Sequence, residues 1–360
     1  MLRSGGVQFH VDRQAEELRK RGYDVFLITP RPRHYKDEPP AGTIFVGNSA
    51  KLNVPISTSL ELGMNLKRDT IDDMLLRYNF DLLHIHEPEV PILGAQIIAK
   101  ATCPIVATFH AVIPDTPTAR TLEAIRTARA KTIFSRINAV TAVSDVAADF
   151  IRKNTDNEVA IIPNALDLSS YKKQASKRNN SRIVYVGRLE KRKGVPYLLQ
   201  AFYELQVSMP NAKLDIVGDG PAREKLEEYV AEHDVKNVTF WGFVSEAKKR
   251  ELMLRADLFC SPAIYGESFG IVLIEAMAMG IVTVAGDNPG YASVMKGTGM
   301  NSLVNPRDIP TFARRMQLML QDEPMRQLWR DWAAEYVKQF DMKKVVDSYE
   351  KIYKRLTRKK

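Results

Sequence analysis

Short runs of apolar, mostly β-branched residues alternate with helical stretches along this sequence, and the alternation restarts once near its middle. Strands that alternate with helices are typical of parallel α/β domains, because each crossover between parallel strands needs a helix. A chain of 360 residues has enough apolar mass for two such domains, each with its own core. The sequence therefore predicts an α/β protein with two Rossmann-like, doubly wound domains in tandem.

The first half is expected to open on a helix from Val7 to Arg21 that Gly22 ends, with a second helix near Leu66 to Tyr78. The predicted strands of this half are Tyr23 to Thr29, Asp81 to His86, Pro104 to His110, Ala139 to Ser144 and Glu158 to Pro163. The polar segment from Ser169 to Arg182 lacks apolar periodicity, and we interpret it as the way into the second domain.

The same alternation is expected in the second half. Its predicted strands are Arg182 to Gly187, Lys213 to Val217, Val238 to Phe243, Leu258 to Ser261 and Ile281 to Ala285. Predicted helices run from Val195 to Val207 and from Pro221 to Glu232, with a proline at the helix start, where its missing N–H matters little. An apolar stripe predicts a last helix from Met342 to Lys360. Because parallel sheets bind ligands beyond the carboxyl ends of their strands, we expect a binding cleft where the two domains face each other.

The most informative motif runs from Gly266 to Gly280, where a short polar loop enters an apolar helix that ends at the second glycine. Glu267 precedes this helix and can hydrogen-bond sugar hydroxyls, while Glu275, about two turns in, can accept from ribose hydroxyls. A helix start attracts a diphosphate through its backbone N–H groups and the helix dipole, and Ser268, Phe269 and Gly270 would present their N–H groups there. The alternative reading is a capped, buried helix with an incidental acid. The motif predicts a donor site for a nucleotide sugar.

A basic turn from Gly187 to Gly194 directly follows a predicted strand. Arg188 and Lys193 are placed to neutralise a leaving diphosphate, where cations act on charge that develops in the transition state. The alternative is a solvated basic turn. A weaker signal is the pair Gly5-Gly6 at the start of the first helix, which would let a phosphate approach the backbone closely.

Histidines end two of the predicted strands. His110 ends the strand that begins at Pro104, so it is expected to face the cleft, although a purely structural histidine is the alternative. His84 and His86 alternate with Ile85 and share one face, but no third ligand lies at a useful spacing, so we expect no metal site there. No Asp-x-Asp triad occurs in the sequence, which indicates that a transferase of this kind would rely on basic residues and helix N-termini rather than on a divalent metal.

The composition gives broad limits. Hydrophobic residues make up 45% and charged residues 26%, as in globular proteins, and no apolar run approaches the roughly 18 residues that span a bilayer. A net charge of +9 is compatible with an anionic membrane surface or a phosphorylated substrate. We expect no nucleic-acid binding, because no helix-turn-helix, zinc or aromatic RNA-binding signature is present. The expected location is the cytoplasm, with peripheral association with the inner face of the plasma membrane as one interpretation.

These motifs resemble glycosyltransferase family 4, of the GT-B fold, over almost the whole chain, with bacterial phosphatidylinositol mannosyltransferases as the most similar group. The resemblance implies a retaining hexosyltransferase that needs no cofactor or metal and transfers a sugar from a nucleotide donor to a lipid-linked acceptor. GDP-mannose is the favoured donor and phosphatidylinositol the model acceptor. The implied domains are residues 1–168 on the acceptor side and 169–338 for the nucleotide sugar, with 339–360 a helix that crosses back to the first domain.

Roles follow from the resemblance residue by residue. The catalytic set would be His110, Glu267, Arg188 and Lys193, with the acceptor contacted by Gln8 and Arg192. The donor would be bound by Gly6, Val244, Glu246, Lys249, Ser268, Phe269, Gly270, Ile271 and Glu275. The base would lie near Val244, where the carboxylate of Glu246 suits the N–H donors of guanine. A UDP-sugar transferase for another glycolipid or glycan, and a nucleotide-sugar binder with impaired catalysis, are the alternatives.

The sequence departs from the family in two places. The family begins with a strand before its glycine loop, whereas only Met1 to Ser4 precede Gly5 here, so we expect the first strand of the N-terminal domain to be missing. Either the sequence starts downstream of that strand, or the strands beside it have unpaired edges. The stretch from Asn65 to Arg77, basic in the relatives, mixes Lys67 and arginines with aspartates, which weakens the case for membrane binding by this helix. The basic C-terminal tail could compensate at about 1 kcal/mol per surface cation.

Overall fold

The computed structural model describes residues 6–32, 35–53, 59–64, 68–88, 93–110, 133–171 and 181–358. The chain divides into two compact units. Unit 1 comprises Met1–Ala165 and Met342–Lys360, and unit 2 comprises Leu166–Asp341. The C-terminal segment therefore returns to the first unit, as predicted.

Unit 1 contains two separate sheets. In the first, β1 (Leu27–Arg31) pairs in parallel with β2 (Thr43–Asn53), which pairs antiparallel with β3 (Ser59–Met64). The second is fully parallel, in the order β4 (Leu83–His86), β5 (Ile105–Phe109), β6 (Ala139–Ala142) and β7 (Val159–Ile161). The helices of this unit are α1 (Gly6–Lys20), α2 (Arg68–Tyr78), α3 (Leu93–Lys100), α5 (Asp145–Arg152) and α13 (Met342–Thr357).

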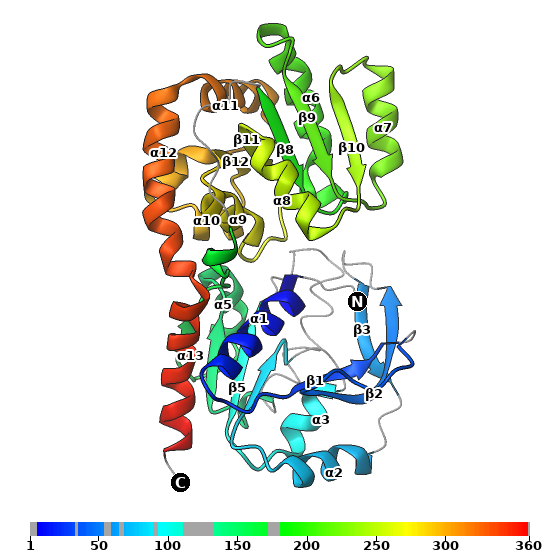
Figure 1. Cartoon of the computed structure of the whole chain (residues 1–360), viewed down its shortest axis with the longest axis vertical. Coiled ribbons are helices and arrows are strands. Elements are labelled where there is room, and N and C mark those ends of the chain that lie inside the picture. The colour runs from blue at the N-terminus through cyan, green and yellow to red at the C-terminus, as the bar shows by residue number, and fades with distance from the viewer. Residues whose placement is uncertain are drawn as a thin grey trace. The chain divides into compact units, whose positions relative to one another are not determined.

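The last helix completes the core of unit 1. Helix α13 lies beside α1 (Figure 1), and its buried side chains share one apolar cluster with Leu18 of α1 and Val106 of β5. The end of α1 is fixed to α13 as well, because the Arg21 guanidinium pairs with Asp347 at 2.6 Å and with Glu350 at 2.9 Å. The core of this unit is thus built from both ends of the chain.

Two predictions for this unit need correction. The strand expected from Tyr23 begins only at Leu27, because the Val25 carbonyl accepts two hydrogen bonds from the Arg19 guanidinium and leaves the ladder. The hairpin formed by β2 and β3 was not predicted at all. The first helix and the strands β4 to β7 lie where the sequence placed them, with ends that differ by a residue or two.

Unit 2 is a single parallel sheet covered by helices. The sheet order is β10 (Val238–Gly242), β9 (Lys213–Val217), β8 (Arg182–Val186), β11 (Leu258–Ser261), β12 (Thr283–Gly286) and β13 (Leu303–Val304). Because β8 pairs with both β9 and β11, the strand order reverses at β8, and ligands of such sheets bind at the carboxyl ends beside this point. The loops that follow β8 and β11 are therefore the first places to look for a site.

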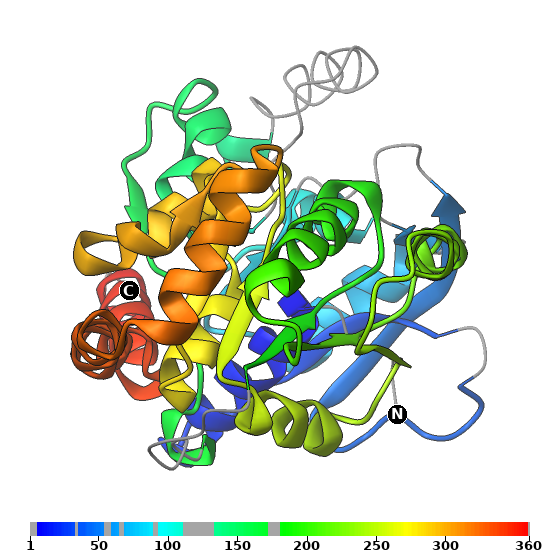
Figure 2. The same ribbon diagram turned by 90° about the horizontal axis from the view of Figure 1, so that it is seen from above.

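The helices of unit 2 are α6 (Val195–Ser208), α7 (Arg223–Glu232), α8 (Glu246–Arg255), α9 (Ile271–Met279), α10 (Pro289–Val294), α11 (Ile309–Gln321) and α12 (Glu323–Tyr336). Helices α6 and α11 pack side by side (Figure 2). Helix α7 begins at Arg223 with Ala222 as its N-cap, so the prediction that Pro221 starts this helix was wrong. The turn before this helix is held by a hydrogen bond from the Ala222 N–H to the Leu189 carbonyl.

Residues 1–5, on which the expectation of a missing first strand depends, lie outside the described residues. No helix in the described part of the chain combines the length and the apolar character needed to cross a bilayer.

Candidate active site

The loop after β8 forms a chain of ion pairs around one buried carboxylate. Glu190 is 8% exposed, and its two oxygens accept from the Arg188 Nη2 and the Arg192 Nε, both at 3.0 Å. The Arg188 side chain is 55% exposed, whereas that of Arg192 is only 13% exposed. Arg188 is therefore available to a ligand from solvent, while Arg192 is held inside the loop.

The loop after β11 brings Glu267 onto the same cations. Its Oε1 lies 2.7 Å from the Lys193 Nζ and 2.7 Å from the Arg192 Nη1, which also donates to the Gly266 carbonyl at 3.2 Å. Although burial alone would lower the pKa of Arg192, the carboxylates of Glu267 and Glu190 raise it. The arrangement unites two predicted catalytic residues, Lys193 and Glu267, and adds Arg192, which the sequence had assigned to the acceptor.

The position of Glu267 is fixed by two glycines. Gly270 is the N-cap of α9 with φ +100°, and a β-carbon there would lie 2.7 Å from the buried ring of Tyr291. Gly290 of α10 approaches the Glu267 backbone so closely that a β-carbon would lie 1.9 Å from its carbonyl oxygen. Helix α10 thus supports the loop from behind, and a side chain at either glycine would displace it.

The start of α9 has the properties expected of an anion site. The helix begins at Ile271, directly after Ser268, Phe269 and Gly270, and its first N–H groups have no partners within the helix. It ends at Gly280, as predicted, and this glycine has a left-handed backbone with φ +70°. Glu275 is the fifth residue of α9, so it lies just over one turn in, and the expectation of two turns was wrong.

Glu275 is buried and only half satisfied. Its Oε1 accepts from the Tyr171 hydroxyl and the Lys249 Nζ, both at 2.9 Å, while its Oε2 is buried with no hydrogen-bond partner among the described residues. Burial alone would lower the pKa of Lys249, but its pairs with Glu275 and Glu246 raise it. A buried acceptor without a donor is unfavourable, so this oxygen is a natural partner for a ligand hydroxyl.

The residues expected near the base surround this pair. Ser245 caps α8, Val244 is half-buried just before it, and Glu246 is 49% exposed. The Glu246 carboxylate lies 2.8 Å from the Lys249 Nζ and 3.3 Å from the Arg250 Nε. Its charge is therefore already shared between two cations.

Sequence reasoning missed two residues of this region. Tyr171 precedes Glu275 by 104 positions and also lies under the Arg250 guanidinium at 4.4 Å, and no local pattern links them. Glu190 stood inside the recognised basic turn as its single acid, and this could have indicated its role in holding the arginines on either side.

Four of the six histidines of the chain gather in unit 1. His10 of α1, His84 and His86 of β4, and His110 directly after β5 lie with neighbouring rings between 4.2 and 6.5 Å apart. The His86 Nδ1 contacts the His110 Nε2 at 2.9 Å. The backbone N–H of His110 donates to Glu87 at 2.6 Å, which fixes the residue at the strand end.

The cluster is linked to the C-terminal helix by a hydrogen-bonded chain. The His84 Nδ1 contacts the Tyr353 hydroxyl at 2.6 Å, and its Nε2 contacts the Thr108 hydroxyl at 2.7 Å. Burial lowers the pKa of His110 and of His84 to about 3 and that of His10 to about 4, and it lowers the pKa of His86 as well. These imidazoles are therefore neutral at physiological pH, and His110 can donate or accept a hydrogen bond without carrying charge.

The remaining predicted residues lie at the start of α1. Gly6 is the first residue of this helix, Gln8 is exposed in its first turn, and Gly5 lies outside the described residues. No group of three or more His, Cys, Asp or Glu side chains among the described residues is arranged to hold a metal ion.

Two α/β units, one of them a doubly wound parallel sheet with a carboxylate, cations and a helix start beside its switch point, are what a glycosyltransferase of the GT-B type would have. Residues 4–170 match the family described as Glycosyltransferase Family 4, and residues 169–336 match the family described as Glycosyl transferases group 1. A phosphatidyl-myo-inositol mannosyltransferase of Mycolicibacterium smegmatis is 32% identical over 97% of this chain and 90% of its own length. The chain belongs to glycosyltransferase family 4, which supports a hexosyltransferase activity.

Solved structures agree on the fold. A sucrose-phosphate synthase from Thermosynechococcus elongatus superposes with a TM-score of 0.79 over 99% of this chain and 95% of its own, at 20% identity. Anabaena HepE in complex with UDP and glucose gives a TM-score of 0.68 over 79% of this chain and 80% of its own, also at 20% identity. At these identities the similarity shows the GT-B fold alone.

Proposed function

We propose that this chain transfers a hexose with retention and without a metal ion, from a nucleotide sugar, preferably GDP-mannose, to a lipid-linked acceptor such as phosphatidylinositol. The observation that carries the proposal is the convergence of Glu267, Lys193 and Arg192 within 2.7 Å contacts directly before the start of α9. The retaining course and the absence of a metal rest on the family resemblance.

The cations and the helix start serve the leaving group. Departure of the nucleoside diphosphate places negative charge on its distal phosphate, and fixed positive charges at that position lower the barrier. Lys193 is 17% exposed and Arg188 55% exposed, so both can reach a phosphate. The N–H groups of Phe269 and Gly270 add the positive end of the helix dipole.

In the protein without donor, Glu267 neutralises two of the cations of the site, Lys193 and Arg192. Its carboxylate is bound to the cations that the diphosphate needs, so it stands in for a phosphate until the donor arrives. When the donor binds, the released carboxylate becomes free to accept hydrogen bonds from sugar hydroxyls. Glu275 would take a ribose hydroxyl on its buried, unpartnered Oε2. His110 of unit 1 is proposed to contact the donor sugar as a neutral imidazole, and no enzymic nucleophile is assigned.

The acceptor proposal rests on relatives. The Mycolicibacterium protein is named for transfer to phosphatidyl-myo-inositol, and Gln8, exposed on α1, is the proposed contact for an inositol group. A lipid acceptor would require access to a membrane surface, and the basic end of α13 is one source of attraction for anionic lipids. Location in the cytoplasm, peripheral on the inner face of the plasma membrane, is part of this proposal.

Donor binding and transfer can be separated by two variants. We expect Glu267→Gln to lower the transfer rate by at least about tenfold while the affinity for GDP stays equal or rises, because Lys193 and Arg192 are released from their carboxylate. Lys193→Met should lower the affinity for GDP and for GDP-mannose to a similar extent. Lys248→Met is the matched control, because the ion pair of this lysine is with Glu251 on the surface of α8 and its other described side-chain contact is the Trp241 ring, at 5.1 Å. Calorimetric titration with GDP, together with radiolabelled transfer to phosphatidylinositol vesicles, measures both quantities.

Four outcomes would contradict parts of the proposal. Unchanged transfer in both Glu267→Ala and Arg188→Ala would exclude the site. Tighter binding of UDP-glucose or UDP-N-acetylglucosamine than of GDP-mannose would favour the UDP-sugar alternative, and the engagement of Glu246 by Lys249 and Arg250 is an observation in its favour. Loss of activity in EDTA would refute metal independence, and inversion at the anomeric carbon, observed by NMR of the product, would refute retention.

A further inference from the structure

One aromatic side chain anchors the donor loop, residues 264–270, which leads into α9. From Ile264 to Ser268 every residue of this loop is half-buried or exposed, whereas Phe269 is only 4% exposed. The backbone takes left-handed conformations on both sides of this stretch, at Gly266 with φ +74° and at Gly270 with φ +100°. Phe269 is therefore the buried side chain through which the rest of unit 2 can fix the loop.

The partner of Phe269 comes from the carboxyl end of unit 2. The ring of Phe340 lies edge-to-face against that of Phe269, with ring centroids 5.7 Å apart and ring planes at 84°. Phe340 is the last residue of the 3₁₀ helix η4 (Val337–Phe340), and it is 3% exposed. Rings in this arrangement attract through their quadrupoles in addition to burying apolar area. The donor loop is thus held by a residue from a distant part of the chain.

Phe340 is itself held from two directions. Its ring lies edge-to-face against that of Tyr336, with centroids 5.7 Å apart, and Tyr336 stacks on Trp332 of α12 at 4.8 Å. Its carbonyl accepts a hydrogen bond of 2.9 Å from the N–H of Leu166, the first residue of unit 2. Leu166 also forms a parallel bridge with Asp341, the last residue of that unit. The segment that carries Phe340 is therefore fixed by α12 and by the pairing of the two points where the chain enters and leaves unit 2.

The ion pairs of the donor loop are the anchors that a donor would displace. Glu267 is held by Lys193 and Arg192 at 2.7 Å each, and these cations are the ones that the diphosphate needs. When they turn to phosphate oxygens, their pairs with the carboxylate no longer position the loop. The contact between Phe269 and Phe340 involves no charge and does not take part in this exchange. It can therefore keep the N–H groups at the start of α9 in place while the ion pairs rearrange.

We propose that Phe340 is a positioning residue for the donor site, and that it acts through Phe269 on the backbone N–H groups that bind the diphosphate. The inference rests on the proposed function, because the donor loop is the proposed diphosphate site. It goes beyond that function because it makes donor affinity depend on a buried residue outside the loops that carry the charged groups. This residue stands one position before the end of unit 2, so the order of the segment that leaves the unit contributes to donor affinity.

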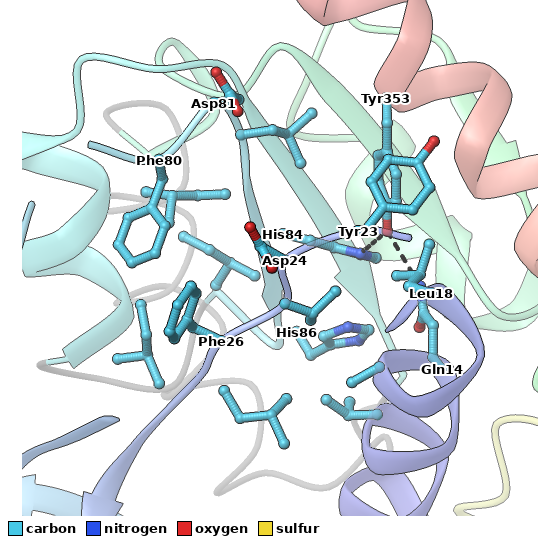
Figure 3. Close-up of a pocket in the computed structure, with 18 of the residues that line it drawn as sticks. Gln14, Leu18, Tyr23, Asp24, Phe26, Phe80, Asp81, His84, His86 and Tyr353 are labelled. Atoms are coloured by element: carbon cyan, nitrogen blue, oxygen red, sulfur yellow. Dashed lines mark hydrogen bonds between the residues drawn. The ribbon is translucent and has the colours of Figure 1, made fainter. Parts of the chain in front are cut away.

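The test compares Phe340→Leu with Phe312→Leu in the full chain. Phe312 is a buried phenylalanine of the same unit, on α11, which packs on α6, so its substitution removes a similar apolar contact elsewhere. In the protein without ligand, we expect Phe340→Leu to speed amide exchange about fivefold in peptides that cover residues 264–270. Phe312→Leu should leave this exchange unchanged. Peptides that cover β4, which borders the cavity of unit 1 drawn in Figure 3, are the internal reference for both variants.

Calorimetric titration with GDP gives the second measurement. Phe340→Leu should lower the affinity for GDP about five- to tenfold, because a loosened loop must be ordered when the diphosphate binds. Phe312→Leu should retain the affinity of the unaltered chain. Phe269→Leu should have the same effect as Phe340→Leu, and the double variant should bind GDP no more weakly than either single variant, because both residues act through one contact.

Loop exchange or GDP affinity that is the same in Phe340→Leu and Phe312→Leu would overturn the inference. Additive losses of GDP affinity in the double variant would overturn it too, since Phe340 would then act by another route than Phe269. Absence of GDP binding to the unaltered chain would refute the proposed donor site instead, and the exchange comparison, which needs no ligand, would still decide whether Phe340 holds the loop. If Phe340→Leu does not fold, Phe340→Ile enters the same measurements in its place.

Discussion

Acidification should unfold unit 1 before unit 2. The four clustered histidines are neutral in the folded state, with the pKa of His10 lowered to about 4 and those of His84 and His110 to about 3 from an ordinary value of 6.5. At a pH between the lowered pKa in the folded state and the ordinary value of 6.5, these histidines bind protons in the unfolded chain but not in the folded chain. The stability contributed by a neutral buried histidine is therefore complete above about pH 6.5 and is lost as the pH falls toward its folded pKa.

The size of the effect follows from the same shifts. Below about pH 6.5, each such histidine removes about 1.4 kcal/mol of unfolding free energy per pH unit, so a change from about pH 7.5 to pH 5 removes about 2 kcal/mol for one residue. Several histidines acting together would approach the whole stability of an ordinary domain, which is about 5–15 kcal/mol. Unit 1 should therefore be close to unfolding near pH 5.

The two units can be followed separately. All three tryptophans, Trp241, Trp329 and Trp332, belong to unit 2, so their fluorescence reports on that unit, whereas far-UV circular dichroism reports on both. Urea titrations at several pH values should show a dichroism transition that moves to lower urea on acidification, while the fluorescence transition moves little. His84→Gln should lower stability near pH 7.5 but reduce the acid-dependent loss by up to about 2 kcal/mol. The exposed His233→Gln is the control and should change neither quantity. A fluorescence transition that shifts as much as the dichroism transition would refute the reasoning.

Further substitutions test the donor half in unit 2, with tryptophan fluorescence in urea as the measure of stability. Gly270→Ala forces a β-carbon into the Tyr291 ring at a left-handed position and should remove about 1–3 kcal/mol, and an unchanged midpoint would show that the loop is free to move. Lys249→Met leaves the buried Glu275 without its cation and should remove about 3–5 kcal/mol; a neutral effect would mean that water reaches this carboxylate. Tyr171→Phe removes one hydrogen bond to the same carboxylate and should remove about 1–2 kcal/mol, less than Lys249→Met, so a reversed order would contradict the assigned partners.

The sequence was informative wherever local pattern decides structure. The parallel strands of unit 2 and the helix that ends at Gly280 were predicted because periodicity and a left-handed glycine are local signals. The β2–β3 hairpin was missed because its stability comes from cross-strand pairing. The late start of β1 was missed because the Val25 carbonyl accepts hydrogen bonds from the side chain of Arg19 in the preceding helix, a contact that strand periodicity does not indicate.

For the candidate site, the motif residues were predictable and their partners were not. Glu267 and Lys193 stood out in the sequence, but the contact between them joins residues 74 positions apart and depends on the neighbouring ends of β8 and β11. The same holds for Tyr171 and Glu275. The residues of a motif can be recognised from the local sequence, whereas an ion pair between two motifs can be predicted only when the order of the strands in the sheet is known.

The return of α13 to unit 1 affects the order in which the molecule can be made. A ribosome releases the chain from its amino end, and domains usually fold as they emerge. Here the apolar cluster around Leu18 and Val106 lacks Val346 and Tyr349 until almost the whole chain has been synthesised. Unit 2 is continuous in sequence and can fold as soon as it is released, so the half of the protein that is translated first would be the last to close. During that interval its unfinished core is a surface on which chaperones could act.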